Sequence, residues 1–98
     1  MPDYIFLMHD DATGSVAEAD WPAWFAKLRA AGSFEGGSAI GEGAAFRKAG
    51  EAGPVAGHIG GFVRATAADL EAAQDLLDGN PVYEAGGTVE IRLLPVTD

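Results

Sequence analysis

The chain has 98 residues and a formal net charge of −9, with 15 acidic and 6 basic side chains. A chain of this length is expected to form a single domain, residues 1–98, with a modest core that a partner surface would help to stabilise. The acidic balance argues against nucleic acid, because so few cations cannot neutralise a phosphate backbone. The absence of cysteine excludes disulfides and thiol nucleophiles. No signal-like segment or long apolar stretch is present, so we expect a cytoplasmic protein without membrane contact.

The first element is a short apolar run at residues 4–8, bounded by polar residues, which predicts a strand. Its side chains are apolar on both faces, with Tyr4, Phe6 and Met8 on one and Ile5 and Leu7 on the other. A strand that is apolar on both faces must be covered from both sides.

A helix follows, and we expect Asp20 to cap its start and Gly32 to end it. Its apolar residues recur at helical spacing and form one buried stripe of Trp21, Trp24, Phe25 and Leu28. The next segment is rich in glycine, and we predict a strand at 34–40, a turn at 41–43, a second strand arm at 44–48 and a loop at 50–57.

The second half predicts a strand at residues 59–65, in which Gly60 and Gly61 permit close approach of a backbone or a ligand. Thr66 and Asp69 stand at capping-box spacing before a second helix. The buried residues expected on that helix are Leu70, Ala73 and Leu77, and Asp78-Gly79 should end it. A short helical turn at 80–85 and a last strand at 88–94 complete the chain.

This order predicts an α+β fold of the ferredoxin-like type, a four-stranded antiparallel sheet with two helices on one face. We take the first and third strands to be parallel, which would place His9 and His58 at opposite ends of the sheet. Since two helices cover one face only, the doubly apolar first strand predicts a homodimer that covers the other face.

The chain resembles the YCII-related (YciI-like) family of the dimeric α/β-barrel superfamily. The resemblance rests on residues 4–11, 28–32, 36–37, 60–63 and 69–73, and at the end of the chain on 80–86 with its Asn-Pro pair, 89–92 and Pro95. It implies a dimer whose sheets pack face to face, with one cleft per subunit beside the helices.

Some members of that family carry a His–Asp pair that is thought to perform acid–base chemistry. By the resemblance, Trp24 after Pro22-Ala23 occupies the position of the His, and Asn80 before Pro81 occupies the position of the Asp. Neither an indole nor an amide transfers protons near neutral pH. In a related branch, an Asp-Gly-Pro-Phe loop precedes the Gly-Gly strand, and this chain has Ala52-Gly53-Pro54-Val55 there.

His9, followed by Asp10 and Asp11, is the candidate catalytic residue, because a neighbouring carboxylate can hold one tautomer of a histidine. We expect no cofactor and no metal, since one His with carboxylates is an incomplete ligand set. A second set, proposed to bind a ligand, consists of Trp24, Asn80 and Tyr83. The alternative is that Asn80 caps the turn before Pro81 and that Tyr83 lies in the core.

Two rare cations, Arg47 and Arg64, are expected to pair with carboxylates rather than with an anionic ligand. Three functions therefore stay open: a dimeric module that binds a small molecule or a partner protein, a small lyase- or hydrolase-type enzyme acting on a hydroxylated or aromatic substrate, and a purely structural dimer.

Overall fold

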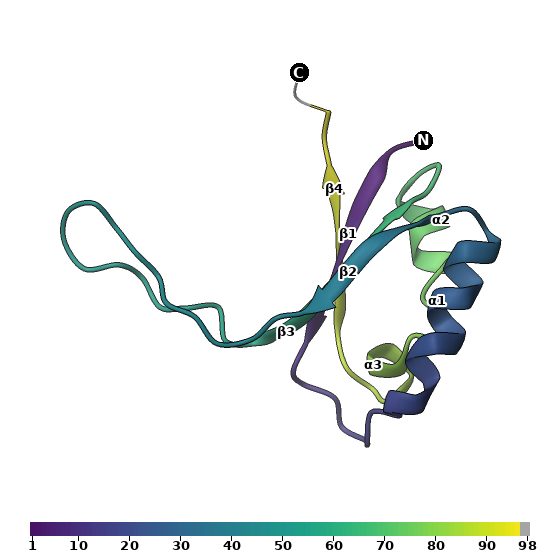
Figure 1. The fold of residues 1–98 in the computed structure, drawn as a ribbon, viewed down its shortest axis with the longest axis horizontal. Helices are drawn as coiled ribbons and strands as arrows, with labels where there is room; N and C mark the ends of the chain where they lie inside the picture. Colours follow the sequence, from purple (N-terminus) through teal and green to yellow (C-terminus); the bar gives the residue numbers. More distant parts are fainter. Residues whose placement is uncertain (97–98) are drawn as a thin grey trace.

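The structure is a computed structural model that describes residues 1–96. Its strands form one antiparallel sheet in the order β2-β3-β1-β4, which confirms the predicted α+β, ferredoxin-like fold. The helices lie together on one side of this sheet (Figure 1). In chain order the elements are β1 (Asp3–His9), the 3-10 helix η1 (Glu18–Asp20), α1 (Trp21–Ala30), β2 (Phe34–Ala39), β3 (Ile59–Thr66), α2 (Leu70–Asp75), α3 (Pro81–Glu84) and β4 (Val89–Leu94).

The direction of β3 differs from the sequence-based expectation. β1 pairs antiparallel with both β3 and β4, so the prediction that β1 and β3 are parallel was wrong. The chain reverses between β2 and β3, which pair antiparallel, while helix α1 returns the chain so that β1 and β2 run the same way. As a result His9, at the end of β1, lies opposite Ile59, at the start of β3.

The core lies between the sheet and the helices. Tyr4, Phe6 and Met8 are buried on the helix side, where Trp24 and Leu28 of α1 pack against the sheet. The opposite face of β1 carries Ile5 and Leu7, and both stay partly exposed in the part of the chain that the structure describes. The two apolar faces of β1 were therefore predicted correctly, and only one of them is covered within this chain.

The predicted starts of both helices need correction. Asp20 precedes α1, but its side chain makes no capping hydrogen bond, because η1 already leads the backbone into the helix. Asp69, rather than Thr66, caps α2 and accepts a hydrogen bond from the Ala72 backbone N–H at 2.8 Å, while Thr66 ends β3. Leu70, expected in the core, is 56% exposed because it begins the helix just beyond the sheet.

Residues 40–58, which connect β2 and β3, form a long two-limbed projection that we call the arm. The predicted second strand at 44–48 was wrong, because no residue of the arm is in a strand. Figure 1 shows the arm extending from the tips of β2 and β3, away from the helices. Only residues 50–57 were predicted to be a loop, and they are irregular in the structure. The reach of the arm was not predicted.

Candidate functional site

A cleft opens where the N-terminal end of α1 approaches β2, β3 and the end of β1. Its volume is about 430 Å³. The apolar part of its wall comes from Met8, Val16, Trp21, Phe25 and Val82, and polar side chains come from His9, Asp10, Glu18 and Ser38. This combination of aromatic surface and a few polar groups is typical of a small-molecule site.

The Gly60-Gly61 pair lies in this cleft, as part of its floor. A Cβ on Gly61 would lie 3.3 Å from the backbone oxygen of Ser38, and one on Gly60 would lie 2.5 Å from Oδ1 of Asp10. Side chains at these positions would therefore crowd the strand pairing and the end of β1. The sequence predicted that a backbone or a ligand approaches these glycines closely. In the structure the backbone of β2 does so at Gly61, and both glycines also line the open cleft.

The three residues predicted to bind a ligand are not part of the cleft lining. Trp24 is 1% exposed, and its indole N–H donates a hydrogen bond to the Leu76 carbonyl at 2.8 Å. Asn80 is fully buried and caps α3, because its Oδ1 accepts from the Tyr83 backbone N–H at 3.0 Å. Tyr83 is 44% exposed, so it is not a core residue.

Trp24 nevertheless lies directly behind the cleft wall. Its ring packs against Trp21 and Phe25 with centroid distances of 5.9 and 5.8 Å, and both of these residues face the cleft. Trp24 also approaches the corner that leads to Asn80, since a Cβ on Gly79 would lie 3.8 Å from its Cδ1 atom. Among the described residues, the buried Nδ2 of Asn80 has no hydrogen-bond partner.

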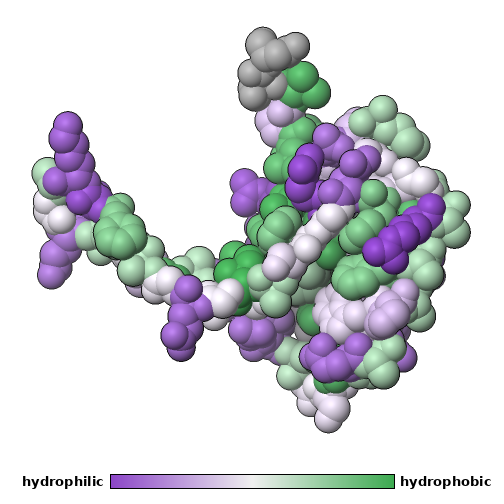
Figure 2. Space-filling model, in the orientation of Figure 1, coloured by the Kyte–Doolittle hydropathy of each residue, from purple (hydrophilic) through white to green (hydrophobic). Residues whose placement is uncertain are grey.

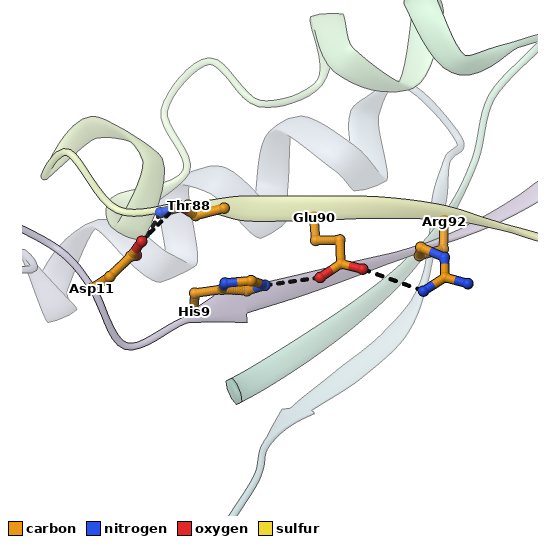
Figure 3. Close-up of polar contacts among 5 residues, drawn as sticks. All are labelled: His9, Asp11, Thr88, Glu90 and Arg92. Atoms are coloured by element: carbon orange, nitrogen blue, oxygen red, sulfur yellow. Dashed lines mark hydrogen bonds and ion pairs between the residues drawn. The ribbon is translucent and has the colours of Figure 1, made fainter. Parts of the chain in front are cut away.

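His9 forms a polar chain across the open face of the sheet (Figure 3). Its Nε2 donates to Oε1 of Glu90 at 2.9 Å, and Oε2 of Glu90 accepts from Arg92 at 3.3 Å. The partner of His9 is thus Glu90 on β4, rather than the adjacent Asp10 or Asp11. The His58 ring is edge-on to His9 at 5.0 Å, so the expectation that they lie at opposite ends of the sheet was wrong.

Two carboxyl groups at this end of the sheet have lowered pKa values. Hydrogen bonds from the Thr88 hydroxyl and backbone N–H, at 2.6 and 2.7 Å, lower the pKa of Asp11. Hydrogen bonds from His9 and then Arg92 lower the pKa of Glu90. Both groups are consequently ionised at neutral pH and hold the ends of β1 and β4 together.

We expect Thr88→Val to raise the pKa of Asp11, because the hydroxyl hydrogen bond is the largest cause of its lowering. A lowered carboxyl pKa stabilises the fold above the unfolded-state pKa, and this stabilisation is lost as pH falls through the folded-state pKa. The variant should thus lose less stability on acidification below about pH 4, where an unfolded Asp titrates. An NMR titration of the Asp11 carboxyl carbon measures this shift.

Thr13→Val is the matched control, because the Thr13 hydroxyl donates to the Ala85 carbonyl and not to a carboxylate. An Asp11 pKa that is the same in wild type and Thr88→Val would contradict the assignment of the hydrogen bond as its cause.

The two arginines singled out from the sequence have partners within the chain. Arg64 lies 3.8 Å from the Asp3 carboxylate, as predicted, whereas Arg47 donates to the Glu51 backbone carbonyl at 2.9 Å. Within residues 1–96, no three side chains of the metal-binding types come together. The helices of this same range are too short to cross a membrane.

The model of the YCII-related domain family matches residues 6–97, nearly the whole chain. The chain belongs to the YCII-related family. The comparison with curated proteins finds no match. In this YCII-related chain the two positions that the resemblance connects with acid–base chemistry, Trp24 and Asn80, are both buried.

Sequence reasoning missed several residues of the cleft. Trp21 and Phe25 were assigned to the buried stripe of α1. They lie at the edge of that stripe and face the cleft. Val16 and Glu18 precede the helix in a segment without periodicity, so no pattern connected them with Ser38 on β2. The useful signal was an aromatic stripe on α1 that is wider than the packing against the sheet requires.

Proposed function

We propose that this YCII-related protein is a homodimer that binds a small, planar molecule in the cleft of each subunit. The observation that carries the proposal is the cleft of about 430 Å³ with the aromatic side chains of Trp21 and Phe25 in its wall. Clefts that bind small molecules have volumes of roughly 300–1,000 Å³ and are mostly apolar, with a few polar groups that orient the ligand.

The charges around the cleft favour a neutral or cationic ligand. Asp10 and Glu18 contribute carboxylates, and among the described residues no Lys or Arg lines the cleft. An anionic ligand would meet these carboxylates as well as the net charge of −9 on the whole chain. A cationic group on an aromatic ligand would meet the carboxylates, and its ring would stack on the indole of Trp21.

Trp24, Asn80 and Tyr83 keep a role in this proposal. Trp24 supports the rings of Trp21 and Phe25 from behind, which fixes the shape of the wall. A buried donor without an acceptor costs about 1–3 kcal/mol, so a ligand atom or a water next to Asn80 Nδ2 would be stabilising. Direct contact of the ligand with these three residues stays a prediction.

A panel of aromatic amines with matched aromatic carboxylates tests the binding function. We expect the amines to quench tryptophan fluorescence and raise the melting temperature, and the carboxylates to do neither. Trp21→Ala should weaken binding at least about tenfold, because stacking contributes roughly 1–3 kcal/mol and 1.4 kcal/mol is a factor of ten. Leu93→Ala, on an exposed residue outside the cleft, is the control. Binding of the carboxylates alone would refute the proposed ligand class.

The homodimer is supported by the uncovered face of the sheet. Ile5, Leu7 and Phe62 are only partly buried there, and contact with a second sheet would remove them from water. We expect Leu7→Lys to dissociate the dimer, because a charge buried in an interface costs several kcal/mol. Leu7 is partly exposed in the single chain, so the new cation stays in contact with water there and the monomer should stay folded.

Sedimentation velocity at micromolar concentration measures this effect. Leu93→Lys makes the same charge change on an exposed residue of the other face and should leave the dimer intact. A wild-type protein that sediments as a folded monomer would refute the dimer.

The second candidate function is acid–base catalysis by His9. The observation that favours it is the 2.9 Å hydrogen bond from His9 to Glu90, which holds one tautomer of a histidine at the cleft. A turnover screen on hydroxylated aromatic compounds from about pH 5 to 9 tests it. Turnover that falls at acidic pH and is lost in both His9→Ala and Glu90→Gln would establish this enzyme function.

A further inference from the structure

The arm has no support from the rest of its own chain. A Cβ added at Gly41, Gly43 or Gly53 would meet nothing within 4 Å. The radius of gyration is 14.8 Å, against about 13 Å for a compact chain of 100 residues. In Figure 2 the arm is a narrow strip that leaves the body of the molecule and touches it only at its base.

An apolar aromatic side chain stands on this unsupported segment. Phe46 is 90% exposed, and Val55 on the other limb is 53% exposed. Burial of a phenylalanine side chain stabilises a structure by roughly 1.5–3 kcal/mol, and Phe46 does not contribute this free energy while it is exposed to water. The rings of Trp21 and Phe25 in the cleft wall offer an aromatic surface for it.

The charges of the arm complement those of the cleft. Phe46 is followed by Arg47 and Lys48, whose charges balance those of Glu42 and Glu51, so the arm is neutral. The net charge of −9 therefore resides on the rest of the chain. Two of its carboxylates, Asp10 and Glu18, lie in the cleft wall, where a cation next to an inserted phenyl ring would meet them.

The direction of the arm decides whose cleft it reaches. In Figure 1 the arm projects away from the helices, and its tip therefore points away from the wall that Trp21 and Phe25 of α1 form in the cleft of the same chain. The homodimer proposed above places the partner on the arm's side of the sheet. From Ala39 to Phe46 an extended chain spans about 23 Å, and packed sheets are only about 10 Å apart. The arm is thus long enough to pass the partner sheet.

We propose that the arm of each subunit crosses to the second copy and closes the mouth of its cleft, with Phe46 covering a ligand that stacks on Trp21 and Phe25. Arg47 and Lys48 then face Glu18 of that copy, and Asp10 meets the cationic group of the ligand. Each binding site is therefore composite: the wall comes from one subunit and the lid from the other. This inference rests on the proposed homodimer and adds to it the residues that complete the site.

Cross-linking between two differently tagged chains tests the crossing. The chain has no cysteine, so Phe46→Cys in one chain and Glu18→Cys in the other introduce the only thiols. We expect mild oxidation to join the two chains at least about tenfold more than when Glu18→Cys is replaced by Glu71→Cys, on an exposed residue of α2. Cross-linking at the control level would overturn the proposal. So would a chain with both substitutions that forms only an internal disulfide, since the arm would then close its own cleft.

A second measurement uses Phe46→Ser, with Val55→Ser as the control on the other limb of the arm. We expect both variants to remain dimeric in sedimentation, and Phe46→Ser alone to release an aromatic amine at least about tenfold faster. If the Phe46→Ser dimer releases the amine as slowly as the wild-type dimer, the crossing is wrong but the binding function stands. A monomeric wild type overturns both.

Discussion

Trp24→Ala is expected to reduce the free energy of unfolding by about 3–5 kcal/mol, the usual cost of truncating a large buried aromatic side chain. Trp24 is 1% exposed and its ring lies 6.2 Å from that of Phe6. The truncation also leaves the Leu76 carbonyl without its donor. Small domains unfold with only about 5–15 kcal/mol, so much of the stability would be lost. Urea unfolding followed by circular dichroism measures the change.

Trp24→Phe is the matched control. It keeps an aromatic ring in the core and removes the indole N–H, so we expect a smaller loss of about 1–2 kcal/mol. A loss below about 1 kcal/mol for the alanine variant would show that the indole is not packed as described.

The second large effect is expected for Gly37→Ala in β2. The new Cβ would lie 2.5 Å from the Phe62 oxygen and 2.9 Å from the Val63 Cα, and neither backbone atom can move without separating β2 from β3. Overpacking of this kind costs about 3 kcal/mol. Hydrogen exchange should show lower protection of the β2–β3 amides, because their pairing is the part that must shift.

Gly43→Ala in the arm is the control, since nothing lies within 4 Å of its added Cβ. We expect its effect to stay within about 0.5 kcal/mol. Equal stability of Gly37→Ala and Gly43→Ala would contradict the close approach of Gly37 to Phe62 and Val63 in the β2–β3 pair.

Much of the fold could be predicted from hydrophobic patterning. The apolar run of β1 and the apolar stripe of α1 each identified an element, and Tyr4, Phe6 and Met8 of the run are buried together with Trp24 and Leu28 of the stripe. The predicted direction of β3 was wrong because hydrophobic periodicity carries no information about strand direction. The direction follows from the chain reversal between β2 and β3. The cap of α2 was misplaced by three residues, because both Thr66 and Asp69 have suitable side chains and only the backbone decides between them.

The site was harder to predict than the fold. His9 was recognised as a polar residue at a strand end, but its partner Glu90 is 81 positions away and comes next to it only through β1–β4 pairing. Trp24 and Asn80 were expected to bind a ligand by resemblance, but both are buried, with the Trp24 indole N–H bonded to the Leu76 carbonyl and only the Oδ1 of Asn80 bonded, to the Tyr83 N–H. No local pattern shows that an indole N–H finds its acceptor on another helix.

The strand order also determines when this sheet can form during synthesis. β1 leaves the ribosome before the other strands, yet it lies inside the sheet and needs both β3 and β4 as neighbours. Until β4 emerges, the apolar residues of β1 lack one of their two neighbouring strands. The chain between β1 and β4 forms a long loop, and closing a long loop slows folding. Nascent chains that end before β4 should consequently be bound by chaperones, and the domain should fold only after translation has passed its last strand.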